Sequence, residues 1–287
     1  MAVFNNFATL SYNGGTTNSN TVTGEILDTL SSTKIAVMDD YTAKDDATYV
    51  ISLVNSSTAP LTDVTITDDL GGYLYGTTTV YPLAYTQGSV RLYINGVLQP
   101  APAVTAGPPL VFSGISIPAG GNTLIIYEAR VNDYADIGIT GTITNTATVT
   151  SAVGDPDTVN ITTSTTITVE SSVLLSITKS LTPSTIPENG RLTYTFVIQN
   201  TGNTEAIATD NVTVTDLFDP VLNPISVTYN GTGWTAGTQY TYDPTTGQFA
   251  TVPGRITVPA ATYTQDPISG LWTMEPGVSI LTVTGIV

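Results

Sequence analysis

Three kinds of polar side chain fall on apolar faces of predicted strands, and together they could form a covalent bond. Residues two apart along a strand share a face, so alternation assigns each residue a side. By this rule a lysine, an aspartate and an asparagine each occur twice among apolar neighbours: Lys34 and Lys179, Asp68 and Asp216, Asn145 and Asn6. The chain contains only three lysines, and two of them occupy one repeated position.

Such a constellation is costly to bury unless its members satisfy one another. A lysine made neutral by desolvation can attack an asparagine carboxamide, while a carboxyl group moves the protons and ammonia leaves. The product is an amide cross-link between the first and last strands of a domain. We expect Lys34 to join Asn145 with Asp68 assisting, and Lys179 to join Asn6 of the next subunit with Asp216 assisting.

A structural interpretation of the same residues stays open. Each lysine could extend its head group to solvent. Each aspartate follows a Val-Thr-x-Thr strand and could cap the turn that ends it. Each asparagine could pair with backbone. Similar cross-links are found in surface pilins and adhesins of Gram-positive bacteria, so the covalent interpretation rests partly on resemblance.

The elements that would position these residues are predicted to be strands. The 287 residues include only 10% charged residues and are rich in Thr, Val, Ile, Tyr, Gly and Asn, a β composition. Alternating segments such as 49–53 and 64–67 are separated by Asn, Gly, Pro and Asp clusters. No long helical pattern or bilayer-spanning run occurs in the sequence. The chain is therefore predicted to be all-β, with two tandem immunoglobulin-like sandwiches.

Composition also narrows the classes of function. The net charge is −16 with seven Lys and Arg, so the chain lacks the basic patch that nucleic acid requires. It has no Cys and no His, which removes disulfides, thiolate ligands, the commonest general base and the usual zinc ligand. We expect no enzymatic turnover, no cofactor, no metal site and no membrane insertion.

Two copies of one domain can be aligned along the sequence. Thr33-Lys34 matches Thr178-Lys179, and a Thr-Tyr strand follows fifteen residues later at Tyr49 and at Tyr194. An Asn stands six residues after each Tyr, and segments 63–68 and 211–216 each end in Val-Thr-x-Thr-Asp. The repeat places the two lysines, and the two aspartates, at corresponding positions.

This ordered set of motifs resembles the conserved repeat of prokaryotic surface proteins known as domain of unknown function eleven. The resemblance covers nearly the whole chain. It implies an immunoglobulin-like sandwich on a cell envelope or an appendage. It implies no catalytic activity.

The repeat breaks at one element. The first copy ends in a predicted hairpin over 141–169, with a turn at Gly154–Asp157, and the second copy has no counterpart before Val287. A similar hairpin occurs at the N-terminus, where segment 4–11 matches 143–150. We therefore predict a donor hairpin over 1–27, a complete sandwich over 28–170 and an incomplete one over 171–287. The expected inward-facing donor residues are Phe4, Asn6, Ala8, Leu10, Val22 and Ile26.

An incomplete sandwich would expose an apolar face and unpaired strand groups, while a free hairpin is marginal in water. Docking the hairpin of one subunit into the second domain of the next solves both problems. Donor and acceptor surfaces differ, so the contact propagates into a head-to-tail filament of identical subunits. Closure of the hairpin onto its own second domain, or a disordered N-terminus, are the alternatives.

Weaker signals support other functions. Trp234, Tyr240 and Tyr242 could form a sugar-binding patch, so the alternative function is a monomeric tandem-domain adhesin or carbohydrate-binding module. Three pairs of adjacent aspartates, at 39–40, 45–46 and 68–69, lack the spacing of a calcium loop. A hydrolase using paired carboxylates has no recognisable motif here.

The expected location is extracellular, on a cell or spore surface. The N-terminus, Met1 to Phe7, has no basic segment followed by an apolar one, so no signal peptide is visible. Assembly inside a mother cell onto a spore would fit that feature. A tip or anchor protein stays unidentified.

Overall fold

The computed structural model describes residues 2–26, 30–151 and 159–287 of the chain. The predicted turn at Gly154–Asp157 lies outside this part. Within it the structure is built from strands, with a single 3-10 turn, η1 (Ala208–Asp210). In the described residues, no helix is long and apolar enough to cross a membrane.

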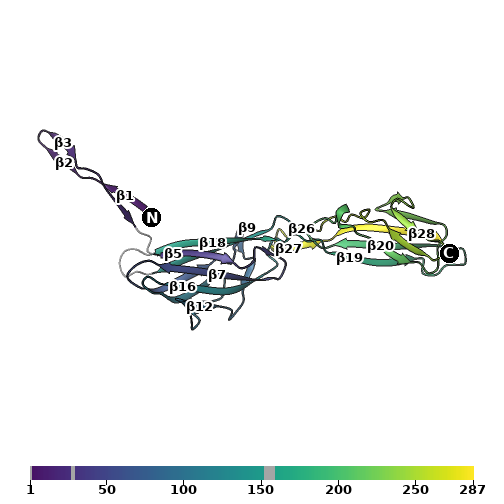
Figure 1. The fold of residues 1–287 in the computed structure, drawn as a ribbon, viewed down its shortest axis with the longest axis horizontal. Coiled ribbons are helices and arrows are strands. Elements are labelled where there is room, and N and C mark those ends of the chain that lie inside the picture. Colours follow the sequence, from purple (N-terminus) through teal and green to yellow (C-terminus); the bar gives the residue numbers. More distant parts are fainter. Residues whose placement is uncertain (1, 27–29, 152–158) are drawn as a thin grey trace. The chain divides into compact units, whose positions relative to one another are not determined.

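The chain divides into two compact units, each containing stacked sheets (Figure 1). The first comprises residues 1–39, 44–132 and 143–167, and the second comprises residues 40–43, 133–142 and 168–287. We call their two-sheet parts the first and second sandwich. The prediction of an all-β chain with tandem β-sandwich domains is confirmed by these sheets.

One sheet of the first sandwich carries the strand with Lys34. Its strands follow one another in the order β13 (Val97–Gln99), β12 (Arg91–Ile94), β16 (Asn122–Val131), β7 (Asp46–Asn55) and β5 (Leu30–Ala36), and β11 (Leu83–Tyr85) also pairs with β16. Buried and partly exposed residues alternate along β7 and β16, as a sheet with one covered face requires. The covered face supplies Tyr49, Ile51, Ile125 and Tyr127 to the core.

The opposite sheet carries the strands with Asp68 and Asn145. Its order is β14 (Ala103–Thr105), β15 (Leu110–Ile117), β8 (Leu61–Asp68), β17 (Thr142–Ser151) and β18 (Val159–Val169). The short strand β6 (Asp40–Tyr41) extends this sheet by pairing with Thr168 and Val169 of β18, which belong with it to the second unit. A separate ribbon pairs β9 (Tyr73–Tyr75) with β10 (Thr78–Val80). Strand β17 pairs with β8 in the register Ala147 to Asp68 and Val149 to Ile66. The predicted closing hairpin is thus β17 and β18.

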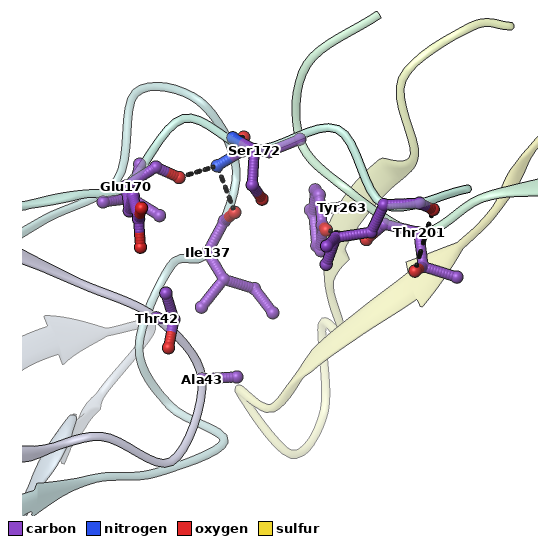
Figure 2. A pocket seen from close by; sticks show the side chains of 10 residues that line it. Thr42, Ala43, Ile137, Glu170, Ser172, Thr201 and Tyr263 are labelled. Atoms are coloured by element: carbon purple, nitrogen blue, oxygen red, sulfur yellow. Dashed lines mark hydrogen bonds between the residues drawn. The ribbon is translucent and has the colours of Figure 1, made fainter. Parts of the chain in front are cut away.

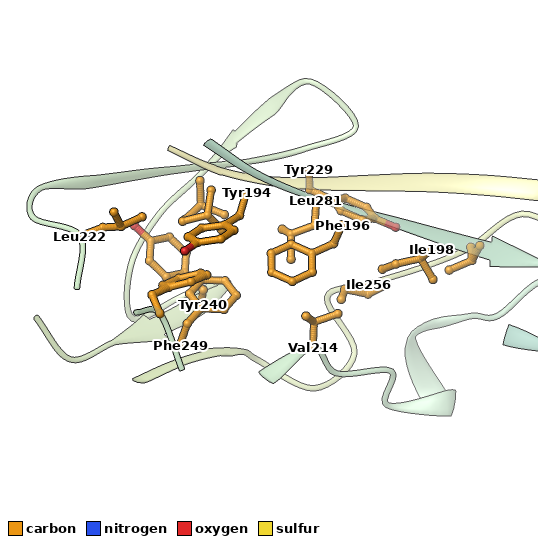
Figure 3. Packing of buried hydrophobic residues seen from close by; sticks show 14 of the residues in the cluster. Tyr194, Phe196, Ile198, Val214, Leu222, Tyr229, Tyr240, Phe249, Ile256 and Leu281 are labelled. Atoms are coloured by element: carbon orange, nitrogen blue, oxygen red, sulfur yellow. The ribbon is translucent and has the colours of Figure 1, made fainter. Parts of the chain in front are cut away.

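The second sandwich repeats the first sheet but has a smaller second sheet. The first sheet runs β19 (Leu175–Thr182), β20 (Arg191–Asn200), β28 (Gly277–Ile286), β22 (Ile225–Tyr229) and β23 (Thr232–Trp234). The second sheet runs β21 (Thr215–Leu217), β25 (Gln248–Thr251) and β24 (Tyr240–Tyr242), and β26 (Thr262–Gln265) pairs with β27 (Trp272–Glu275). Aromatic and aliphatic side chains fill the space between the sheets, among them Tyr194, Phe196, Phe249 and Leu281 (Figure 3).

The repeated asparagine six residues after each tyrosine has a structural role. The Asn55 amide donates to Ala59 O at 2.8 Å, and its Oδ1 accepts from the Ser57 backbone. Asn200 makes the equivalent bonds, donating to Thr204 O at 2.7 Å and accepting from the Gly202 backbone. Both side chains hold the turn that follows the strand, which explains why this motif recurs.

The predicted strand over 212–215 is shorter than expected. Strand β21 begins at Thr215, and residues 211–214 have no strand assignment. In the first sandwich β8 lies between β15 and β17, whereas β21 is the end strand of its sheet, with β25 as its neighbour. The neighbouring strand β25 ends at Thr251, whose N–H donates to Val214 O, so β25 cannot extend the ladder further towards residue 211.

The N-terminal residues form two short ladders that we call the N-terminal ribbon (residues 2–26; Figure 1). Strand β1 (Ala2–Asn6) pairs with β4 (Val22–Ile26), and β2 (Thr9–Tyr12) pairs with β3 (Gly15–Asn18). Side-chain bonds reinforce the pairing: Thr9 donates to Asn18 and Thr23 donates to Asn5, both at 2.7 Å. Its described side chains are exposed along nearly the whole length, including apolar Leu10 at 64%.

Candidate functional site

The first sandwich brings Lys34 and Asp68 into direct contact in its core. The Lys34 ammonium lies 2.7 Å from Asp68 Oδ2, and both side chains have no solvent exposure. The Lys34 Nζ atom is also 5.2 Å from the centre of the Tyr49 ring. The structural interpretation expected the Lys34 head group to extend to solvent, and the structure shows that it does not. The other carboxylate oxygen, Asp68 Oδ1, accepts the Leu70 backbone N–H at 3.0 Å, which is the predicted turn cap.

Asn145 reaches the same carboxylate through a tyrosine. The Tyr127 hydroxyl donates to Asp68 Oδ2 and accepts from Asn145 Nδ2 at 3.1 Å. Within the described residues, the buried Asn145 Oδ1 has no hydrogen-bond partner. An unsatisfied buried carbonyl costs about 1–3 kcal/mol. Lysine, aspartate, tyrosine and asparagine form one continuous buried chain.

Burial shifts two of these groups towards their neutral forms. Desolvation lowers the pKa of Lys34, although the Asp68 carboxylate opposes this shift. Desolvation also raises the pKa of Tyr127 well above its ordinary value, and the charge of Asp68 acts in the same direction. A lysine that loses its proton easily is a better nucleophile, because only the neutral amine has a free electron pair.

Lys34, Asp68 and Asn145 connect the two sheets of the first sandwich. Lys34 lies on β5 at the edge of one sheet, while Asp68 on β8 and Asn145 on β17 belong to the opposite sheet. The expectation of a bond between first and last strands is therefore corrected, since β18 follows β17 along the chain. A bond between Lys34 and Asn145 would join sheet to sheet across the core.

The second sandwich contains the corresponding lysine and aspartate in an open setting. Lys179 forms an ion pair with Asp216 Oδ2, and the side chains are 38% and 17% exposed. The ammonium also lies over the Tyr194 ring, 4.3 Å from its centre, and 5.5 Å from the centre of Phe218. The predicted third member, Asn6, belongs to the N-terminal ribbon, where its side chain is exposed. The pairing of Asn6 with Lys179 therefore stays a prediction.

The inner face around Lys179 is uncovered. Residues sharing the Lys179 side of β19 are apolar and exposed, with Leu175 at 39% and Ile177 at 52%. In the first sandwich the matching strand β5 buries both Leu30 and Lys34. An open hollow of about 600 Å³ borders β21 and is lined by Thr215, Asp216, Leu217, Gln248 and Phe249. In the first sandwich the strand that corresponds to β21, β8, is paired with β17, and β18 follows in the sheet.

The predicted donor residues lie on the N-terminal ribbon. Asn6, Ala8, Leu10 and Val22 are exposed. Phe4 and Ile26 belong to β1 and β4, and their side chains lie outside the part that the structure describes. The ribbon therefore presents apolar side chains and an asparagine to solvent.

The aromatic residues considered as a sugar patch pack into the second sandwich instead. Tyr240 is buried, and the Tyr242 hydroxyl donates to Leu222 O at 2.7 Å. The Trp234 ring lies 4.9 Å from the Tyr229 ring. Tyr240 thus belongs to the core, and the half-buried Trp234 and Tyr242 pack against it.

A cavity of about 250 Å³ in the second unit has a structural explanation. Its walls include Thr42, Ile137, Glu170 and Tyr263 (Figure 2). The Asn203 amide donates to Glu170 O at 2.9 Å and to Ile137 O at 3.3 Å, and the Tyr263 hydroxyl donates to Thr201 O at 2.8 Å. These polar groups hold loops together. No group of three metal-ligating side chains occurs in the described residues.

Tyr127 is the site residue that the sequence reasoning missed. It lies on β16, a strand that carries none of the predicted site residues. Its face is shared by buried Ile125 and Ala129, so alternation alone assigns it to the core. The partners of its hydroxyl come from β8 and β17, which only the packing of the two sheets reveals.

Comparisons with known proteins find matches among solved structures alone. No protein-family model and no curated protein matches the sequence, so the family suggested by the repeat stays a prediction. Similar solved structures include BcpA, the major pilin subunit of Bacillus cereus, with 12% identity, coverage of 96% of this chain and 73% of that chain, and a TM-score of 0.38. The pilus backbone RrgB from Streptococcus pneumoniae has 12% identity and a TM-score of 0.34, and the match covers 86% of this chain and 55% of that chain. The collagen-binding subdomain of the Enterococcus faecalis surface protein ACE has 9% identity and a TM-score of 0.31, and the match covers 49% of this chain and 98% of that chain.

Proposed function

We propose that this protein is a structural subunit that assembles head to tail by strand complementation. The N-terminal ribbon of one copy inserts into the second sandwich of the next copy. The observation that carries the proposal is the contrast between matching strands: β5 buries its inner face, and β19 exposes the same face. An exposed apolar sheet face and a free two-stranded ribbon are both unfavourable in water, and each can cover the other.

The register of docking follows from the first sandwich. Asn6, Ala8 and Leu10 match Asn145, Ala147 and Val149 in the sequence alignment. Since Ala147 pairs with Asp68 and Val149 with Ile66, we place Ala8 opposite Asp216 and Leu10 opposite Val214. The ribbon then adds to the free edge of β21, where backbone groups pair and alternate side chains fill the core.

A covalent bond would lock this contact. In the proposed register Asn6 takes the place that Asn145 holds in the first sandwich, beside the pair formed by Lys179 and Asp216. We propose one amide bond inside each subunit, Lys34 to Asn145, and one between neighbouring subunits, Lys179 to Asn6. The closed geometry of the first site supports this chemistry, because the lysine, the aspartate and the asparagine lie in one buried chain.

The filament is proposed to lie on a cell or spore surface. The net charge of −16 keeps densely packed copies soluble and repels anionic polymers. Covalent cross-links would give mechanical strength to a chain that has no Cys for disulfides. The proposed partner of the chain is itself, in an open head-to-tail polymer without enzymatic turnover.

Negative-stain electron microscopy tests the assembly mechanism. We expect filaments from the full-length chain and none from a chain lacking residues 1–27. A synthetic peptide of residues 1–27 should bind the truncated chain in stoichiometric amount, because it supplies the missing strands. Dispersed monomers from the full-length chain would contradict the proposal and favour a monomeric adhesin.

A point substitution separates docking from folding. Leu10 is exposed in the free subunit, so Leu10→Asp should leave its melting temperature unchanged while preventing filaments. Ser11 lies on the opposite face of β2, so Ser11→Asp should assemble normally. Equal loss of assembly in both variants would argue against an inward-facing Leu10.

A further inference from the structure

We propose that Tyr127 is a catalytic residue of the cross-linking reaction in the first sandwich, passing a proton from Asp68 to the amide nitrogen that leaves Asn145. This inference rests on the proposed Lys34–Asn145 bond. It is carried by the position of the hydroxyl, which donates to Asp68 Oδ2 and accepts from Asn145 Nδ2 at 3.1 Å. The phenol oxygen is therefore the hydrogen-bond link between the carboxyl group and the departing nitrogen.

The arrangement of Asp68 leaves one oxygen for the reaction. Its Oδ1 atom is held by the Leu70 backbone N–H at 3.0 Å. Its Oδ2 atom contacts both Lys34 Nζ and the Tyr127 hydroxyl. A proton taken from Lys34 thus arrives on the oxygen that faces Tyr127. From there the hydroxyl can accept this proton and pass its own to Asn145 Nδ2.

The proposed steps balance in atoms and charge. Asp68 first takes a proton from the Lys34 ammonium, and the neutral amine attacks Asn145 Cγ to form the new C–N bond. Asp68 then delivers a proton through Tyr127 to Nδ2 and takes the remaining excess proton from the Lys34 nitrogen. The Cγ–Nδ2 bond breaks and ammonia departs, carrying that last proton as ammonium. Asp68 ends as a carboxylate and Tyr127 as a neutral phenol, and no oxidant or reductant is needed.

The relay is specific to the first sandwich. Tyr127 lies opposite Tyr49 in the ladder between β16 and β7. Tyr194 matches Tyr49 in the repeat, and its ladder partner on β28 is Val283. A valine side chain cannot carry a proton. We therefore expect the bond inside the subunit to form faster than the bond between subunits.

The test is Tyr127→Phe in the full-length chain, with Tyr85→Phe as the matched control. The Tyr85 ring is 6.5 Å from the Tyr127 ring, so both variants remove a hydroxyl from the same aromatic cluster. The chains are produced in unfolded form, and so without the bond. During refolding, intact-mass spectrometry follows the loss of one ammonia per bond, and peptide mapping assigns each bond. Loss of the relay should slow the Lys34–Asn145 bond by about 10²–10⁴-fold, the usual contribution of a positioned proton donor.

Three outcomes decide the proposal. A slow bond in Tyr127→Phe and a normal rate in Tyr85→Phe support the relay. Bond formation at the wild-type rate in Tyr127→Phe overturns the relay while leaving the proposed cross-link intact. No ammonia loss from the wild-type chain overturns both the cross-link and the relay.

A background that cannot react separates catalysis from packing. In Asn145→Ala chains the bond cannot form, so adding Tyr127→Phe measures only the structural effect of the hydroxyl on the melting temperature. A melting temperature equal to that of Asn145→Ala, together with slow bond formation in Tyr127→Phe alone, supports a chemical role. A refolded Tyr127→Phe chain that lacks native near-ultraviolet circular dichroism would overturn it in favour of a structural role.

Discussion

The two sandwiches place equivalent strands in opposite environments. Strand β5 buries Leu30 and Lys34, whereas the matching residues Leu175 and Lys179 on β19 are exposed. The strands occupy the same position in their sheets, next to β7 and β20. What differs is the opposite sheet, where β17 and β18 continue beyond β8 but no described strand lies beyond β21. The comparison teaches that an apolar strand face is completed by its partner sheet and not by its own sequence.

The two lysines show the same contrast at the level of charge. Lys34 and Asp68 have no solvent exposure, so their pair must be satisfied by its neighbours. Lys179 keeps contact with solvent while it pairs with Asp216. Docking of a ribbon from another copy would convert the second environment into the first. This conversion is what the following predictions test.

The largest expected effect is the loss of covalent linkage between subunits. Boiled wild-type filaments should give a ladder of multimers in denaturing gels, and Asn6→Ala should give only monomers because the carboxamide is gone. Asn145→Ala should keep the ladder. Asn5→Ala is the matched control, because Asn5 is adjacent to Asn6 on β1 and therefore faces the opposite side of the strand. A ladder that survives in Asn6→Ala would show that another residue forms the link.

A second comparison concerns matching leucines. Leu30→Ala removes a buried side chain and should lower the free energy of unfolding by about 2–5 kcal/mol. Leu175→Ala should change the unfolding of the monomer by less than about 1 kcal/mol, because the side chain is already partly exposed. The Leu175 variant should instead weaken filament assembly. Urea unfolding of separated monomers measures the free energy of unfolding of both variants. Equal losses of stability in the two would contradict the open second sandwich.

The smallest expected effect is a pH dependence confined to the first site. In Asn145→Ala the lowered pKa of Lys34 means that the unfolded chain binds more protons, so stability rises with pH up to about 10. The raised pKa of Tyr127 has the opposite sign, so its contribution is lost as pH rises further. Each group changes the free energy by at most about 1.4 kcal/mol per pH unit.

Urea unfolding between pH 7 and 11 would detect this profile. The control is Lys34→Met in the Asn145→Ala chain, which should lose the rising part below pH 10. A rising part that persists in the control would assign it to a different group.

Much of the fold follows from local pattern. Alternation in segments 49–53 and 64–67 predicted strands with one buried face, and the structure confirms them as parts of β7 and β8. The repeat also put Lys34 and Lys179, and Asp68 and Asp216, at corresponding strand positions, because strand parity is a local property. Both pairs are in contact in the structure.

The tertiary structure determined the contacts between residues that are distant in the sequence. The sequence determined that Lys34, Asp68 and Asn145 lie on inward faces, but it could not order the two sheets or show that Tyr127 links Asp68 to Asn145. It also predicted a strand from residue 212, whereas pairing begins at Thr215. Side-chain parity is fixed within one strand, while contacts across a core depend on the packing of strands that are distant in the chain. For that physical reason the sequence determined the faces, and only the tertiary structure determined their partners.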